Sequence, residues 1–350
     1  MKEFWLNNWK TLLGSTVVAA LITSATAIIV AWINKNKKKD KPDPQTITVH
    51  THVHTSNEAA PEPTPPTPKP KRLNHNYRQA MVYEEQNDYR KALEHYRKAA
   101  EEYGEDTLNQ AMAFNEAGVM CQTLAQYDDA IELFLQAQAI YADDPTANQL
   151  DLAMIYNNLA VVYRNQGKYD EALRWYFKAL AIKEKELNKE HPDTATTYNN
   201  IANVYCEQSK YDKALEWHCK ALAIREKMLG QEHPDTAMTC NNIAAVYYYQ
   251  EEYDKALDWY FKALAVHEKV LGKEHPSTAM TYEGIAIVYG DQEKYDDAFE
   301  LYLKAFRVYW DKLGKDHPNA TKCMNNMRID YDASGAAQPF DDWLAAQLNS

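Results

Sequence analysis

The dipeptide His-Pro recurs at a fixed interval in this chain, and this recurrence limits the fold more strongly than any other feature of the sequence. It stands at residues 191–192, 233–234, 275–276 and 317–318, so each copy follows the last by 42 residues. Tyr-Asp keeps the same interval from residues 127–128 to 295–296. A fixed period of this length is typical of a solenoid, in which each repeat packs only against its neighbours. The fold of the array therefore depends on the secondary structure that one repeat adopts.

One repeat has the spacing of two helices. In the repeat that starts near residue 192, apolar residues of the first half fall three and four positions apart: Tyr198, Ile201, Ala202 and Tyr205. After a turn at residues 208–210 a second apolar face follows: Ala214, Leu215, His218, Ala221, Leu222 and Ile224. This spacing predicts two amphipathic helices. Pro234 is expected to open the next first helix, where a missing N–H costs no hydrogen bond.

Small and large residues alternate at matching places in every repeat. The first helices share a small residue: Ala80, Gly118, Ala160, Ala202, Ala244 and Ala286. The second helices share an alanine: Ala92, Ala130, Ala172, Ala214, Ala256 and Ala298. A large residue follows it four positions later: Tyr96, Phe134, Tyr176, His218, Tyr260 and Tyr302. Small side chains let two helices approach to about 8–10 Å, and large ones fill the space between them.

This pattern resembles the tetratricopeptide repeat. The 42-residue period, the Asn-Asn-x-Ala of the first helices and the closing Glu-His-Pro-Asp-Thr are similar to the subclass found in kinesin light chains and their bacterial look-alikes. The resemblance implies an all-α, right-handed superhelical solenoid of helical hairpins. It covers residues 73–332 as six repeats and a capping half-repeat that starts at Pro318, whose charged residues Arg328 and Asp330 are expected to face solvent. Residues 333–350 are expected to form a tail with a short helix, with Trp343 and Leu344 docked on the array.

In such arrays the first helices line a concave groove that takes an extended peptide or a partner helix. Here the groove positions hold a ladder of paired asparagines: Asn157 and Asn158, Asn199 and Asn200, Asn241 and Asn242. An amide both donates and accepts, so a row of them can hold a peptide main chain. The alternative is that the amides bond between adjacent repeats and stabilise the stack. Other partner-binding candidates on the same helices are Arg164, Asn203, Glu207, Tyr248 and Tyr249, with Asp291 in addition.

The resemblance has two limits at this groove. The resemblance to kinesin light chains implies a basic groove that reads tryptophan-acidic peptides. The groove of this chain instead mixes Arg164 with acidic residues such as Glu84 and Glu207. The carboxylate clamp of chaperone-binding relatives needs lysines in the first helices, and the matching places here hold Asn, Tyr or Glu. Neither preference is therefore carried over to this chain.

The N-terminal residues predict a membrane anchor. After a short flank (1–10), residues 11–33 contain no charged side chain, and about 20 apolar residues span a bilayer as a helix. Lysines follow at residues 35–41, and the positive-inside rule places that side, with the repeats, in the cytoplasm. The alternative is a cleaved signal peptide, with Ala25–Ala27 as the cleavage site, but the apolar run continues beyond it. Residues 34–72 are lysine-rich and then proline-rich, a composition typical of a semi-rigid spacer.

Charge and motifs argue against several other functions. Residues 73–350 carry 28 Lys/Arg and 45 Asp/Glu, which disfavours nucleic-acid binding. Five cysteines without a Cys-x-x-Cys pair suggest neither a disulfide framework nor a zinc ribbon. The His-Pro histidines, of which His191 is the first, are spaced along the array and are expected to be structural, whereas metal ligands converge on one point. His50, His52 and His54 alternate in the linker and are also expected to be incidental.

The sequence contains no recognised catalytic motif, so we expect neither enzymatic activity, nor a cofactor, nor a metal, nor a small-molecule substrate. We expect a single-pass, membrane-tethered adaptor whose groove binds a protein or peptide. A self-associating scaffold of a membrane complex, and a regulatory or sensor component, are the alternatives.

Overall fold

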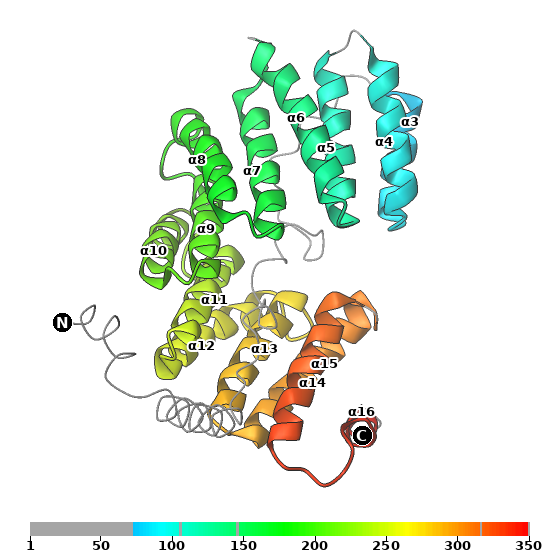
Figure 1. Cartoon of the computed structure of the whole chain (residues 1–350). Helices are drawn as coiled ribbons and strands as arrows, with labels where there is room; N and C mark the ends of the chain where they lie inside the picture. The colour runs from blue at the N-terminus through cyan, green and yellow to red at the C-terminus, as the bar shows by residue number, and fades with distance from the viewer. Residues whose placement is uncertain (1–72, 105–106, 145–146, 316, 349–350) are drawn as a thin grey trace, which may run out of the picture. The chain divides into compact units, whose positions relative to one another are not determined.

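The computed structural model describes residues 73–104, 107–144, 147–315 and 317–348, and these residues form fourteen α-helices and no strand (Figure 1). Seven first helices alternate with six second helices, and one short helix ends the chain. The first helices are α3 (His75–Glu85), α5 (Thr107–Thr123), α7 (Gln149–Asn165), α9 (Pro192–Glu207), α11 (Pro234–Tyr249), α13 (Pro276–Asp291) and α15 (Pro318–Ala333). The second helices are α4 (Tyr89–Tyr103), α6 (Tyr127–Asp143), α8 (Tyr169–Glu186), α10 (Tyr211–Met228), α12 (Tyr253–Val270) and α14 (Tyr295–Leu313). The last helix is α16 (Phe340–Leu348).

Each hairpin is held by the small and large residues that the sequence singled out. In the α9–α10 hairpin, Ala202, Ala214 and Ala221 are completely buried. The small site of α5 is Gly118, where an added Cβ would lie only 2.7 Å from the ring of Phe134. Small residues are therefore required where the two helices meet, and the predicted helical hairpins are confirmed.

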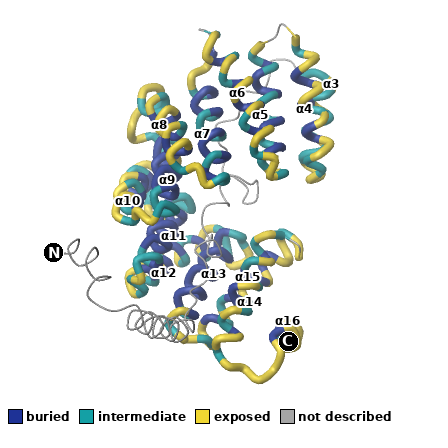
Figure 2. The backbone as a smooth tube through the Cα atoms, in the orientation of Figure 1, coloured by how far each residue is buried: buried dark blue, intermediate teal, exposed yellow. Residues whose placement is uncertain are grey.

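The first helices lie on the inner side of the array. The pairs α5/α7, α9/α11, α11/α13 and α13/α15 contact one another, whereas consecutive second helices make at most marginal contact. The stack therefore curves towards its first helices. Figure 2 shows the result, with α9, α11 and α13 mostly buried and the outer sides of α8 and α10 exposed.

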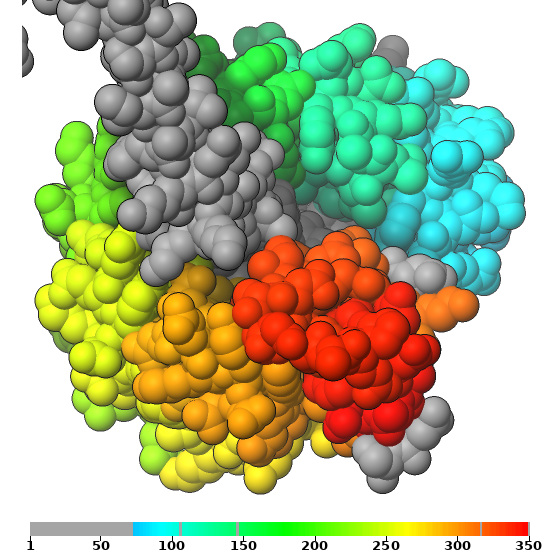
Figure 3. Space-filling view, turned by 60° about the horizontal axis from the view of Figure 1, so that its bottom comes forward, coloured from blue at the N-terminus to red at the C-terminus, as the bar shows by residue number. Residues whose placement is uncertain are grey.

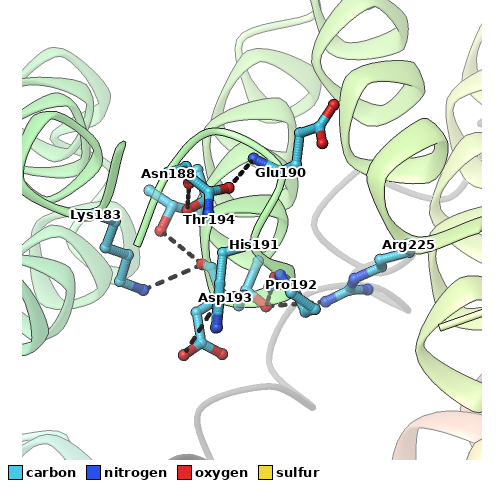
Figure 4. Close-up of polar contacts among 10 residues, drawn as sticks. Lys183, Asn188, Glu190, His191, Pro192, Asp193, Thr194 and Arg225 are labelled. Carbon is cyan, nitrogen blue, oxygen red and sulfur yellow. Dashed lines mark hydrogen bonds and ion pairs between the residues drawn. The ribbon is translucent and has the colours of Figure 1, made fainter. Parts of the chain in front are cut away.

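The His-Pro dipeptides start four of the first helices. The Nδ1 atom of His191 accepts a hydrogen bond of 3.1 Å from the backbone N–H of Asp193, and Pro192 is the first helical residue (Figure 4). His233, His275 and His317 cap α11, α13 and α15 in the same way, each at 3.1 Å. An N-cap acceptor satisfies one of the free N–H groups at a helix start. This geometry gives the histidine series a structural role.

The turns between first and second helices share one left-handed residue. It lies two positions after the first helix: Asn87, Ala125, Gly167, Ser209, Glu251 and Glu293. In the α9–α10 hairpin the N–H of Lys210 donates to the carbonyl of Tyr205, and the N–H of Ser209 donates to that of Cys206. The predicted turn at residues 208–210 is confirmed.

The C-terminal helix α16 covers the last repeat, as predicted from Trp343 and Leu344. The ring of Trp343 lies 4.8 Å from that of Tyr331 and 5.2 Å from that of Phe299, measured between centroids, and Leu344 is buried. Figure 3 shows these C-terminal residues, in red, lying against the preceding repeat.

The expectation that the charged residues of α15 face solvent is wrong for Asp330. This residue packs against α13 at Gly290, where an added Cβ would come within 2.0 Å of its carboxylate. Burial raises the pKa of Asp330 to about 7. The other charged residue, Arg328, forms an ion pair of 2.5 Å with Asp341 of α16.

The expected membrane anchor (11–33) and linker (34–72) lie outside the described residues. Within the described part of the chain, no helix combines the length and the apolar character that a bilayer crossing requires.

Candidate binding surface on the inner face

One stripe of each first helix faces the neighbouring first helices. On α11 it consists of Met238, Asn241, Asn242, Ala245, Tyr248 and Tyr249, which fall three and four residues apart and so share one side of the helix. The predicted candidates Asn157, Asn158 and Arg164 occupy this stripe on α7. Asn199, Asn200, Asn203 and Glu207 occupy it on α9. We call the combined surface of these stripes the inner face.

Near both ends of the array the asparagines bond from one repeat to the next. The side chain of Asn158 donates to Asn115 over 3.0 Å, and that of Asn200 donates to Asn157 over 3.1 Å. At the C-terminal end Asn326 donates to Glu283 over 3.1 Å. Each bond joins the first residue of one pair to the second residue of the next pair, 43 positions later. These three contacts, here called closed rungs, stabilise the stack.

Two consecutive rungs in the centre are open. Asn199 would meet Asn242, but its carbonyl oxygen instead accepts from His218 at 2.8 Å and its amide donates to Thr239 at 3.1 Å. Asn241 would meet residue 284, which is a glycine. As a result the Oδ1 atom of Asn241 and the Nδ2 atom of Asn242 are buried without a hydrogen-bond partner among the described residues. We call these two amides the central notch.

The first of the two open rungs follows from a change of residue in α10. His218 stands where α8, α12 and α14 have Tyr176, Tyr260 and Tyr302, and it is the large residue of its hairpin. Burial, together with the positive charge of Arg225, lowers the pKa of His218 to about 3, so the imidazole is neutral near pH 7. Its Nδ1–H is therefore the donor that holds Asn199.

Two cations approach the inner face from second helices. Arg225 of α10 donates to the carbonyl of Asp235 over 2.8 Å and to the hydroxyls of Thr239 and Thr196, each over 3.0 Å. Lys183 of α8 donates to the carbonyl of Asp193 over 3.3 Å. Figure 4 shows both side chains reaching the first turn of α9 from opposite sides. Burial lowers the pKa of each, and the carboxylates of Asp235 and Asp193 oppose this effect at Arg225.

The other edge of the inner face, where the first helices end, is aromatic and acidic. The hydroxyl of Tyr248 donates to the Oδ2 atom of Asp291 over 2.8 Å, which joins α11 to α13. Burial and the charge of Asp291 raise the pKa of Tyr248 well above its usual range, so its hydroxyl stays protonated. Arg164 lies 3.8 Å from the carboxylate of Glu207, which joins α7 to α9. The inner face therefore has Lys183 and Arg225 at one edge, and tyrosines, carboxylates and Arg164 at the other.

Sequence reasoning missed two parts of this surface. A row of methionines lies three residues before the ladder positions of four first helices: Met112, Met154, Met238 and Met280. It keeps the 42-residue period from Met112 onwards except in α9, so the period itself was the signal. Arg225 and Lys183 were missed because only first helices were searched for groove residues. In the repeat of α9, Thr196 replaces the methionine and Asn203 replaces the apolar residue found as Val161 and Ala245.

The fold defines a helical-repeat protein whose first helices share one inner face. The tetratricopeptide repeat family profile matches residues 71–143, 151–227 and 235–311, which is more than half of the chain. The chain belongs to the tetratricopeptide repeat family.

Solved structures with the same fold have low sequence identity to this chain. BtubC (BKLC) from P. vanneervenii is 22% identical over 70% of this chain and 94% of that one, with a TM-score of 0.53. The apo form of RapI is 19% identical over 74% and 96%, and aspartyl phosphate phosphatase F from Bacillus subtilis is 18% identical over 75% and 70%. Both have a TM-score of 0.53. At these identities the likeness is one of fold alone. The comparison with curated proteins found no match.

Proposed function

We propose that this protein is a membrane-tethered adaptor whose inner face binds an extended segment of a cytoplasmic partner protein at the central notch. The observation that carries the proposal is the pair of buried amide atoms without partners in the central notch, one an acceptor on Asn241 and one a donor on Asn242. The proposed role is binding, with no catalytic step.

A peptide main chain offers what these two amides lack. Each peptide unit carries one N–H and one C=O, so one extended segment can donate to Asn241 and accept from Asn242. A buried polar group left unpaired costs about 1–3 kcal/mol, and a ligand that pairs it recovers that cost on binding. The closed rungs offer no such gain, because their two side chains already bond to each other. The central notch is thus the place on the ladder where a main chain gains most.

The tether is supported by the sequence. The uncharged run at residues 11–33 has the length of a membrane-spanning helix, and the lysines after it favour a cytoplasmic location for the repeats. A proline-rich spacer between anchor and array would hold the inner face away from the bilayer, where a partner can reach it. The family's general use of its arrays in protein recognition supports the same function.

The proposal is tested by selecting peptides from a random twelve-residue phage library on the full chain in lipid nanodiscs. The affinity of the selected peptides is then measured by fluorescence anisotropy. The double variant Asn241→Ala/Asn242→Ala should weaken binding by about tenfold or more, since the loss of about 1.4 kcal/mol is tenfold in affinity. The matched control is Asn157→Ala/Asn200→Ala, which removes a closed rung. It should lower the melting temperature and leave the affinity within about twofold, a change of less than 1 kcal/mol.

Two results would overturn the proposal. One is selected peptides that bind equally well to the wild type and to the central-notch variant while that variant still melts cooperatively. The other is a selection that yields no peptide while the particle size grows with concentration, which would favour a self-associating scaffold.

A further inference from the structure

Four tyrosines cluster at the edge of the inner face where α11 ends. The ring of Tyr248 lies 5.5 Å from that of Tyr249 and 6.0 Å from that of Tyr253, measured between centroids. The ring of Tyr249 lies parallel to that of Tyr211, also at 6.0 Å. These rings come from α10, α11 and α12, so the cluster spans two neighbouring hairpins. We call it the tyrosine cluster.

Carboxylates flank the tyrosine cluster in the repeats on either side. Glu207, Tyr249 and Asp291 are the last residues of α9, α11 and α13, and they lie 42 positions apart. Asp291 is exposed and accepts the hydrogen bond from Tyr248. The end of an α-helix also carries a partial negative charge from its free carbonyls. Glu207 already pairs with Arg164 of α7, whereas the carboxylate of Asp291 is exposed. Three helix ends, the exposed carboxylate of Asp291 and the aromatic rings therefore meet at this edge, and each favours a positive charge.

The net charge of the whole array also favours a basic partner. Residues 73–350 carry 28 basic and 45 acidic side chains, so a basic segment would be attracted to the protein before contact. Lysines of the chain itself also lie over tyrosine rings of the first helices. Lys213 lies 5.5 Å from the ring centroid of Tyr205, Lys255 lies 5.3 Å from that of Tyr247, and Lys294 lies 5.4 Å from that of Tyr289. Pairing of a cation with an aromatic ring is thus a recurring contact in this fold.

We propose that the tyrosine cluster and Asp291 hold a lysine or arginine side chain of the partner segment. This inference rests on the proposed function and names the chemistry of its partner. The cation pairs with the exposed carboxylate of Asp291, beside the buried ring of Tyr248. The partner's main chain meets the amides of Asn241 and Asn242 on the same side of α11, about two turns earlier. The bound segment is therefore basic, and its cationic residue fixes its position along the inner face.

The test uses three fluorescein-labelled peptides of alternating alanine and leucine whose two central residues are lysine, glutamine or glutamate. Binding to the full chain in lipid nanodiscs is measured by anisotropy at low and high salt. The lysine peptide should bind about tenfold more tightly than the glutamine peptide at low salt, and the glutamate peptide should bind most weakly. The advantage of lysine should shrink as sodium chloride is raised, because salt screens the exposed carboxylate.

Variants assign the effect to this edge. Asp291→Asn and Tyr248→Leu should each remove most of the advantage of lysine over glutamine, whereas Tyr248→Phe, which keeps the ring, should retain most of it. Asp311→Asn changes an exposed carboxylate of α14 by the same charge, and it should leave the advantage unchanged. Thermal melts of each variant check that the fold is intact.

The outcomes separate this inference from the proposed function. Equal binding of the lysine and glutamine peptides, or equal effects of Asp291→Asn and Asp311→Asn, would overturn the inference. If phage-selected peptides still depend on Asn241 and Asn242 but carry no excess of lysine or arginine, the proposed function stands and the basic partner does not. If the selected peptides carry a basic residue whose replacement by glutamine weakens binding only when Asp291 is present, the inference is supported.

Discussion

The outer repeats of the array and its central repeats share the same backbone fold, but their asparagines make different contacts. Asn157 and Asn200, towards the N-terminal end, bond across the repeat boundary and help to hold the stack. Asn241 and Asn242, one repeat further along, leave one buried atom each without a partner. The difference comes from His218, which binds Asn199, and from Gly284, which stands at a ladder position without an amide. A repeat protein can therefore leave buried amide atoms without partners by opening a contact that other repeats close.

The largest effect is expected from adding a side chain at Gly284. An added Cβ there would lie 2.6 Å from the ring of Tyr260, which is almost completely buried. We expect Gly284→Ala to lower the free energy of unfolding by roughly 2–3 kcal/mol, because the ring cannot move away in a packed core. Chemical denaturation measures this change.

A control in a second variant distinguishes a clash with Tyr260 from a general destabilisation of α13 by the substitution. In a Tyr260→Leu protein the same Gly284→Ala change should cost clearly less, because the obstructing ring is gone. An equal cost in both backgrounds would mean that the glycine is not required by Tyr260.

The next largest effect is a dependence on pH that arises in the centre. The folded chain holds the pKa of His218 at about 3, against 6.5 for a free histidine, so the unfolded chain binds the proton more readily. Stability from this residue is complete above pH 6.5 and falls as the pH drops below that value. By pH 5 the loss from this single histidine is about 2 kcal/mol.

His218→Tyr restores the residue of the neighbouring repeats and removes this titration. The variant should lose about 2 kcal/mol less than the wild type between pH 8 and pH 5. The difference between the two proteins must be taken because other titrating groups change the stability in the opposite direction over this pH range. Burial raises the pKa of Glu116 and of Asp330 to about 7, and their stabilising contribution is lost as the pH rises. Parallel stability curves for the two proteins would show that His218 does not cause the central dependence.

Single asparagine substitutions compare the two regions directly. Asn200→Ala leaves the carbonyl oxygen of Asn157 without its donor and should cost about 1–2 kcal/mol. Asn242→Ala removes a buried atom that has no partner, so it should cost close to nothing or stabilise the protein. Urea denaturation of both variants checks the contrast. Equal losses would show that Asn242 has a structural role like that of Asn200.

The sequence predicted the repeat hairpins because their determinants are local and periodic. Small residues at 42-residue spacing and helix-opening prolines act within one repeat, so each could be identified without knowing the rest of the fold. The capping role of the histidines required the structure, although their fixed position before Pro192 and its equivalents already indicated that they are structural. The positions of the candidate asparagines on first helices also followed from the period.

The division of the asparagines into closed rungs and a central notch could not be predicted in the same way. It depends on the hydrogen bond between His218 of a second helix and Asn199. It also depends on whether each amide bonds to the preceding repeat or to the following one. Arg225 reaches the inner face from α10 for the same reason. Such contacts join residues of different helices, and no spacing along the chain reveals them. The expectation that Asp330 faces solvent was wrong for the same reason, because it packs against Gly290 of another helix, where a Cβ would not fit.

The smallest expected effect lies in the turns, which both regions share and which are not part of the inner face. Ala125 takes a left-handed conformation with φ of 56°, at the place where the next repeat has Gly167 with φ of 71°. A residue with a Cβ is strained there, so Ala125→Gly should raise the free energy of unfolding by about 0.5–1 kcal/mol. The reverse change, Gly167→Ala, should lower it by a similar amount. Neither should alter the affinity of a peptide bound at the central notch, since stability and binding depend on separate residues. Loss of stability in Ala125→Gly would show that turn geometry does not limit this array, and changed binding in either variant would show that the turns contribute to the inner face.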